Sequence, residues 1–68
     1  MEIISIRIKE IRLENNLTQS QFGKLLNVSQ DNVSLWEKGK SVPGALQIKL
    51  IAKTFKVSAD YILGLEDY

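Results

Sequence analysis

Apolar side chains recur at helical spacing along most of the chain, and no segment alternates at the spacing of a β-strand. In the first segment Ile4, Ile8 and Ile11 follow one another at intervals of four and three residues, which places them on one side of a helix. The pattern predicts an all-α chain of five short helices, at about residues 4–15, 18–27, 29–39, 43–55 and 58–64, capping residues included. In the last helix Leu63 is expected to help close the core.

The second and third helices follow each other so closely that they outline a helix-turn-helix. Thr18 stands three residues before Gln21, the spacing at which the two side chains satisfy each other's backbone amides. Asn27 follows the last apolar residue of this helix and is well suited to the left-handed conformation that ends helices. Ser29 offers the next N-cap, and Gly39 ends the third helix. We place the motif at about residues 18–39.

The motif has an expected inner face and an unusual outer one. The residues expected to be buried are Phe22, Leu25, Leu26, Val28, Val33 and Trp36. Those expected to point outward from the third helix are Gln30, Asp31, Asn32, Ser34 and Leu35. These side chains are short or carry amides, whereas a surface helix without a binding role usually exposes a mixture of lysine and glutamate.

Two positions predict contacts between helices. Gly23 lies inside a helix, where glycine costs about 1 kcal/mol relative to alanine. Either the two helices of the motif approach too closely there for a larger residue, or the cost is simply tolerated. Arg12 borders the Ile8 and Ile11 stripe, and a partly buried arginine needs a carboxylate, for which Glu37 is the expected partner. The alternative is that both are unrelated surface charges.

The loop KSVPGA leads into the fourth helix, with Pro43 expected in its first turn. No Asp, Glu, Ser or Thr stands within that turn, so the backbone amides around Gly44 are candidates for binding an anion, with Lys40 beside them. Water or Ser41 would satisfy the same amides equally well.

Composition narrows the possible functions. The 68 residues are expected to form a single domain, residues 1–68, without any cysteine or histidine. This excludes disulfides, thiolate metal sites and histidine-based catalysis, and no paired carboxylates suggest an enzyme. We expect no metal, cofactor or small-molecule ligand. No apolar run approaches the roughly 20 residues of a membrane span and no signal peptide is evident, so we expect a cytoplasmic protein without membrane contact.

Charge is distributed unevenly. Residues 19–56 carry a net charge of +4, residues 1–18 are balanced, and residues 57–68 carry −3. The positive segment contains the helix-turn-helix, which weakly favours a polyanionic partner. We expect the acidic tail, about residues 65–68, to be frayed.

Some apolar residues lie off the main helical stripes. Those on the first and fourth helices that are candidates for a dimer surface are Ile6, Leu13, Leu46 and Leu50, with Leu65 and Tyr68 as further members.

Taken together, the chain resembles the phage repressor/Cro-type helix-turn-helix family, also called XRE-like. The resemblance covers about residues 4–64 and is carried by IKEIRLENNLTQSQFGKLL, NVSQDNVSLWEKGK and VPGALQIKLIAKTFKVSADYILG. It implies a five-helix, lambda-repressor-like domain that places its third helix in the major groove of DNA.

The resemblance also implies roles for individual residues. The positions that match base-facing residues are Gln30, Asp31 and Leu35, with Asn32 and Ser34 nearby. The positions that match phosphate contacts are Gln19, Lys38 and Lys40, of which Gln19 also braces the recognition helix. Arg12 and Glu37 match the family's buried salt bridge.

Four positions depart from the family pattern. Gly23 stands where alanine is usual, and Asn27 where glycine is usual. Asp31 and Leu35 replace polar or basic groups. An aspartate can accept only from a cytosine amino group, and a leucine can offer only apolar contact to a thymine methyl.

The sequence therefore predicts a prokaryotic or phage transcriptional regulator, most simply a repressor, that binds double-stranded DNA sequence-specifically. A homodimer on a pseudo-palindromic operator, with half-sites about one helical turn apart, is the natural arrangement. The alternative is a protein-interaction module, an antitoxin or adaptor that uses Leu35, Leu46 or Leu50 to hold a partner. Asp31 and the modest net charge favour that alternative.

Overall fold

The computed structural model describes residues 2–66, and in this range the chain forms five α-helices and no strand. The helices are α1 (Ile3–Glu14), α2 (Gln19–Leu26), α3 (Gln30–Glu37), α4 (Ala45–Phe55) and α5 (Ala59–Leu63). The all-α fold with a central helix-turn-helix, predicted from the sequence, is confirmed. None of the described helices is long and apolar enough to cross a membrane.

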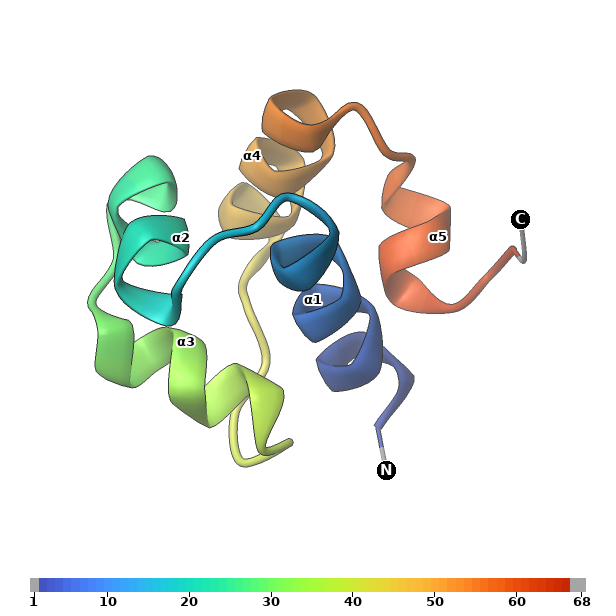
Figure 1. Ribbon diagram of the computed structural model, residues 1–68. Coiled ribbons are helices and arrows are strands. Elements are labelled where there is room, and N and C mark those ends of the chain that lie inside the picture. Colours follow the sequence, from blue (N-terminus) through green and yellow to red (C-terminus); the bar gives the residue numbers. More distant parts are fainter. Residues whose placement is uncertain (1, 67–68) are drawn as a thin grey trace.

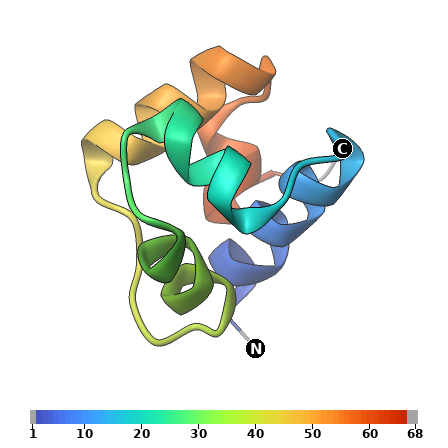
Figure 2. The ribbon, with the colours of Figure 1, turned by 60° about the vertical axis from the view of Figure 1, so that its left-hand side comes forward.

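The helices surround a single core. In Figure 1, α1 lies in the middle of the view, with α2 and α3 on one side, α5 on the other and α4 above. Contacts join α1 to α3 and α5, α2 to α3 and α4, and α4 to α5. Only residues 27–29 lie between α2 and α3, and Figure 2 shows this green segment running from the end of α2 to the start of α3. The short turn and the contact of α1 with α3 hold the third helix at the edge of the molecule.

The capping residues expected in the motif are present. Thr18 Oγ1 accepts from the Gln21 N–H at 3.1 Å, and Gln21 Oε1 accepts from the Thr18 N–H at 2.8 Å. Asn27 has a φ of 60°, and Ser29 Oγ accepts from the Asn32 N–H at 3.2 Å. Each end of α2 and the start of α3 are thus determined by side chains next to them in sequence.

The core gathers the apolar stripes of all five helices. Its buried members are Ile8, Ile11, Phe22, Leu26, Val33, Trp36, Ile48, Ile51, Tyr61 and Ile62. The rings of Phe22 and Phe55 stack with centroids 5.2 Å apart. This stack joins α2 to α4, so the helix-turn-helix is held by the rest of the domain.

Three expectations about packing were wrong. Leu25 was expected inside but is 52% exposed, because the buried face of α2 runs along Phe22, Gly23 and Leu26 and therefore turns away from it. Leu63 was expected to close the core but is 37% exposed, and Tyr61 takes that place. The fourth helix begins at Ala45, so Pro43 is a buried loop residue.

The C-terminal residues were expected to fray. The Leu65 N–H donates to the Asp60 carbonyl oxygen at 2.8 Å, and the Glu66 carboxylate accepts a hydrogen bond from the Ser58 hydroxyl. These two residues are therefore attached to α5. The rest of the expected tail, including Tyr68 as a candidate member of a dimer surface, lies outside the described residues.

Tyr61 connects α5 to α1. Its hydroxyl donates to Glu10 Oε1 at 3.0 Å, and the Arg7 guanidinium lies 4.0 Å from the ring centroid. Burial raises the pKa of Tyr61 above its ordinary value of 10.0, and the hydrogen bond to Glu10 raises the pKa further.

The raised pKa of Tyr61 predicts a loss of stability at alkaline pH. Above about pH 10 the unfolded chain loses a phenol proton that the folded chain retains, so the contribution of Tyr61 is complete below that pH and declines as the pH rises. Tyr61→Phe is expected to make the decline shallower in urea denaturation measured from pH 9 to about pH 11. An equally steep decline in the variant would contradict this assignment.

Candidate nucleic-acid interface

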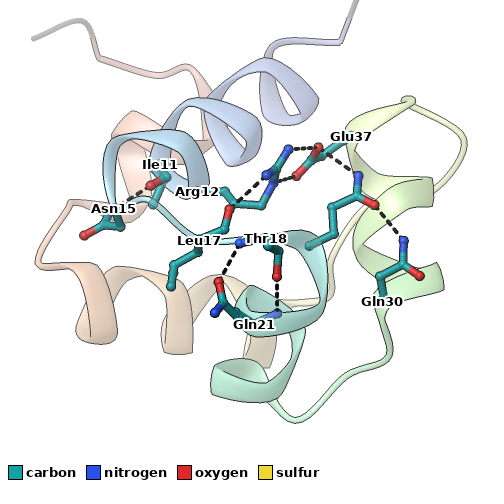
Figure 3. Close-up of polar contacts among 9 residues, drawn as sticks. Ile11, Arg12, Asn15, Leu17, Thr18, Gln21, Gln30 and Glu37 are labelled. Atoms are coloured by element: carbon teal, nitrogen blue, oxygen red, sulfur yellow. Dashed lines mark hydrogen bonds and ion pairs between the residues drawn. The ribbon is translucent and has the colours of Figure 1, made fainter.

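A buried ion pair joins α1 to the end of α3. Arg12 Nε donates to Glu37 Oε2 at 2.6 Å and Arg12 Nη2 donates to Glu37 Oε1 at 3.0 Å, so the pair is bidentate. Arg12 Nη1 also donates to the Leu17 carbonyl oxygen at 2.9 Å. Glu37 is only 7% exposed. The pair therefore ties α1, the segment before α2 and the end of α3 together (Figure 3).

Arg12 keeps its positive charge within this ion pair. The pKa of Arg12 is raised, chiefly by its hydrogen bond to Glu37, although burial acts in the opposite direction. The guanidinium thus stays charged, and the carboxylate of Glu37 always faces a positive group.

Two glutamine side chains extend this pair to the surface. Gln19 Nε2 donates to Glu37 Oε1 at 3.1 Å, and Gln30 Nε2 donates to Gln19 Oε1 at 2.8 Å. We call the series Arg12, Glu37, Gln19 and Gln30 the polar relay; its dashed contacts are drawn in Figure 3. It begins in the interior and ends on an exposed side chain of α3.

The polar relay determines how both amides are oriented. A carboxylate can only accept hydrogen bonds, so Gln19 must present its NH₂ group to Glu37 and its oxygen to Gln30. Gln30 must then donate to that oxygen. Its own Oε1 and the second hydrogen on Nε2 remain available on the surface.

The other predicted base-reading residues lie on the same helix. Asp31, Asn32 and Leu35 are exposed, with Leu35 at 39%, and Ser34 is half-buried. Asp31 also lies in the first turn of α3, where a carboxylate stabilises the positive end of the helix dipole. It thus has a structural role that does not require any ligand.

Apart from Gln19, the predicted phosphate-binding residues follow α3. Lys38 and Lys40 are exposed. Gly44 is the N-cap of α4, and its N–H already donates to Gln47 Oε1 at 2.9 Å. Within residues 2–66 no side chain caps the first-turn amides that follow Gly44, so Ser41 does not satisfy them. The donors open to an anion are therefore those after Gly44.

The chain matches a known family model over most of its length. The model describes a helix-turn-helix, is designated HTH_3, and matches residues 8–62. The chain belongs to this helix-turn-helix family. The match includes the whole polar relay and the α3–α4 loop.

Curated relatives of this HTH_3 chain include regulators and an antitoxin. The HTH-type transcriptional activator BcrR of Enterococcus faecalis is 38% identical over 61 residues, which are 90% of this chain and 30% of the activator. Antitoxin PezA of Streptococcus pneumoniae is 32% identical over 73 aligned residues, covering 97% of this chain and 46% of the antitoxin. The chain thus spans less than half the length of these two relatives.

A solved structure shares the fold. The P22 c2 repressor protein, crystallised in complex with a synthetic operator, superposes with a TM-score of 0.87 at 26% identity, and the match covers 97% of this chain and 100% of that one. This agreement confirms that the HTH_3 chain has the phage repressor fold.

Gly23 in this HTH_3 chain occupies a position of close approach. A Cβ atom there would lie 2.6 Å from the Val28 carbonyl oxygen and 3.3 Å from the Ser29 carbonyl carbon. Both are backbone atoms of the turn. Close approach, rather than mere tolerance, accounts for the glycine, but the neighbour is the turn instead of the body of α3.

The four candidate residues for a dimer surface do not form one group. Leu46 is 65% exposed, whereas Leu50 is half-buried and contacts the core. Ile6 and Leu13 are exposed and line a common groove beside α1, which Leu46 and Leu50 do not line.

The resemblance implied that Gln19 braces the third helix, but it did not identify Gln30 and Glu37 as the two residues that Gln19 contacts. The available signal was weak: both α2 and α3 begin with glutamine. Whether two such amides meet depends on the angle between the helices, which the helical periodicity does not contain.

Proposed function

We propose that this chain binds double-stranded DNA sequence-specifically and regulates transcription, with α3 in the major groove. The observation that carries the proposal is the polar relay, because it holds an exposed amide of α3 in one orientation by contacts that reach the buried Arg12–Glu37 pair. A surface glutamine without a binding role has no need of such support.

The orientation of Gln30 suits adenine. Its Oε1 can accept from the N6 amino group while the remaining hydrogen of Nε2 donates to N7. Guanine presents two acceptors on the same edge and would require both hydrogens of Nε2, one of which is bound to Gln19. Asp31, Asn32, Ser34 and Leu35 are proposed to contact neighbouring base pairs.

Backbone contacts are proposed for the groups around this helix. Gln19, Lys38 and Lys40 would bind phosphates, together with the α4 amides that follow Gly44, where the helix dipole also favours an anion. These contacts determine register on the duplex and make affinity depend on salt.

The relatives support a role in regulating transcription, but they include both a repressor and an activator. The neighbouring P22 structure is a repressor with a synthetic operator, whereas the relative from E. faecalis is named an activator. We propose a repressor without an enzymatic step, acting in the cytoplasm as a homodimer on half-sites about one helical turn apart.

Gln30→Ala is expected to weaken binding to the preferred duplex by about 1–3 kcal/mol and to relax selection at one base pair, because the adenine contact is lost. Lys40→Ala is the matched control and should weaken binding to all duplexes alike, with a salt slope smaller by about one unit. Both are measured by titrating labelled duplexes at two salt concentrations. Equal losses on every sequence for Gln30→Ala would exclude it as a base reader.

A second candidate function is that of an antitoxin or adaptor. It is favoured by the similarity to antitoxin PezA and by the exposure of Leu35 and Leu46 at 39% and 65%. A binding selection from random duplexes at two salt concentrations separates the two functions, since an adaptor without DNA specificity would enrich no common motif.

A further inference from the structure

Helix α1 has apolar residues on the side opposite the core. Ile6 is 38% exposed and Leu13 54% exposed, and the two lie seven residues apart, which is two helical turns. Between them Lys9 and Glu10 are also exposed. These four residues, which we call the α1 outer face, line a groove of about 220 Å³ together with Ser5 and Glu37.

The order of residues on the α1 outer face is self-complementary. If two copies of α1 lie antiparallel about a twofold axis midway between Lys9 and Glu10, Ile6 of each copy faces Leu13 of the other. The same axis places Lys9 of each copy opposite Glu10 of the other. Two apolar pairs then flank two pairs of opposite charge, as a symmetric interface requires.

The charged residues are available for such a contact. Lys9 forms no ion pair with another described residue. Glu10 uses Oε1 to accept from the Tyr61 hydroxyl, which leaves Oε2 for a second partner and holds the side chain in place. We propose that the α1 outer face binds the same face of a second copy of this chain in this antiparallel arrangement.

The contact is small. One helix pair with four residues on each side buries less than the roughly 1,000 Å² of a stable complex, so the association is weak in dilute solution. The contact forms more readily when two copies are held near each other, because their effective concentration is then high. None of the proposed base or phosphate contacts lines the groove. The inference therefore stands independently of DNA binding.

Disulfide trapping without DNA tests this geometry, and the chain has no cysteine of its own to interfere. Ile6→Cys and Leu13→Cys variants are mixed in equal amounts in a glutathione redox buffer. In the proposed arrangement positions 6 and 13 of different copies face each other. Two copies of position 6 lie about seven residues apart along the axis, roughly 10 Å, which exceeds disulfide reach. The mixed dimer is therefore expected to exceed either homodimer about tenfold.

Leu25→Cys is the matched control, since Leu25 is exposed to the same extent as Leu13, at 52% against 54%, but lies on α2. Mixed with Ile6→Cys, it should give only the product ratio of random collision, about two mixed dimers to one of each homodimer. The same random ratio for the Ile6→Cys and Leu13→Cys mixture would overturn the proposal, and so would a predominance of either homodimer.

A charge reversal provides an independent test. Lys9→Glu converts both symmetric pairs into pairs of like charge and is expected to weaken self-association about tenfold. Lys24→Glu, at an exposed position on α2, is the control for the change of net charge. Sedimentation of the unmodified chain and both variants up to millimolar concentration measures this. Equal weakening by the two variants would refute the Lys9–Glu10 pairing.

Discussion

Phe22→Ala is expected to lower the free energy of unfolding by about 3–5 kcal/mol, the usual cost of removing a fully buried aromatic ring. Phe22 is 0% exposed, and its ring stacks on Phe55 at 5.2 Å. A domain of 68 residues typically has a stability of only about 3–10 kcal/mol. The variant should therefore lose a third or more of its stability, which thermal and urea denaturation followed by circular dichroism measures as a lower melting temperature and a lower urea midpoint.

Leu25→Ala is the matched control for this loss. It removes a large apolar side chain from the same helix, three residues further on, but Leu25 is 52% exposed. Its substitution should change the stability by less than about 0.5 kcal/mol. Comparable losses in the two variants would mean that the buried face of α2 is not the one described above.

Arg12→Ala is expected to cost about 3–5 kcal/mol, because it leaves the carboxylate of Glu37 buried without its guanidinium partner. Glu37 is 7% exposed, and Gln19 is its other hydrogen-bond donor. The carbonyl oxygen of Leu17 also loses a donor. Urea denaturation measures the loss, and a change below about 1 kcal/mol would show that the pair is effectively solvated.

Replacing both Arg12 and Glu37 distinguishes the effect of the ion pair on stability from its effect on DNA recognition. Arg12→Met combined with Glu37→Met should restore much of the stability, since well-packed apolar residues often replace a buried ion pair without loss. Specific DNA binding should remain weak, because Gln19 no longer has a carboxylate to orient it and so cannot orient Gln30. A double variant that binds its preferred duplex as tightly and selectively as the unmodified chain would show that the polar relay does not position Gln30.

The elements of this fold are largely readable from local sequence. Thr18 with Gln21, Asn27 and Ser29 cap the motif through backbone groups within three or four residues of themselves, so no distant contact is needed to recognise them. The ion pair of Arg12 with Glu37 spans 25 residues, and it was expected because its two residues match a family pattern.

Local periodicity was insufficient where several faces of a helix are apolar. Phe22, Leu25 and Leu26 satisfy helical spacing equally well, yet only the first and third are buried. The choice depends on the side from which the neighbouring turn approaches, and that side is marked by Gly23, where Val28 lies too close for a Cβ atom. A glycine inside a helix was thus the better guide to the buried face.

By itself the sequence determined the five helices, the caps of the helix-turn-helix and the family of this chain, because these depend on interactions between near neighbours and on a recognisable order of residues. Only the tertiary structure decided that Gln19 joins Glu37 to Gln30. It also separated Leu50, which contacts the core, from the exposed Ile6 and Leu13. The physical reason is that hydrogen bonds are directional over less than about 3.5 Å, so the angle at which helices cross decides which side chains meet.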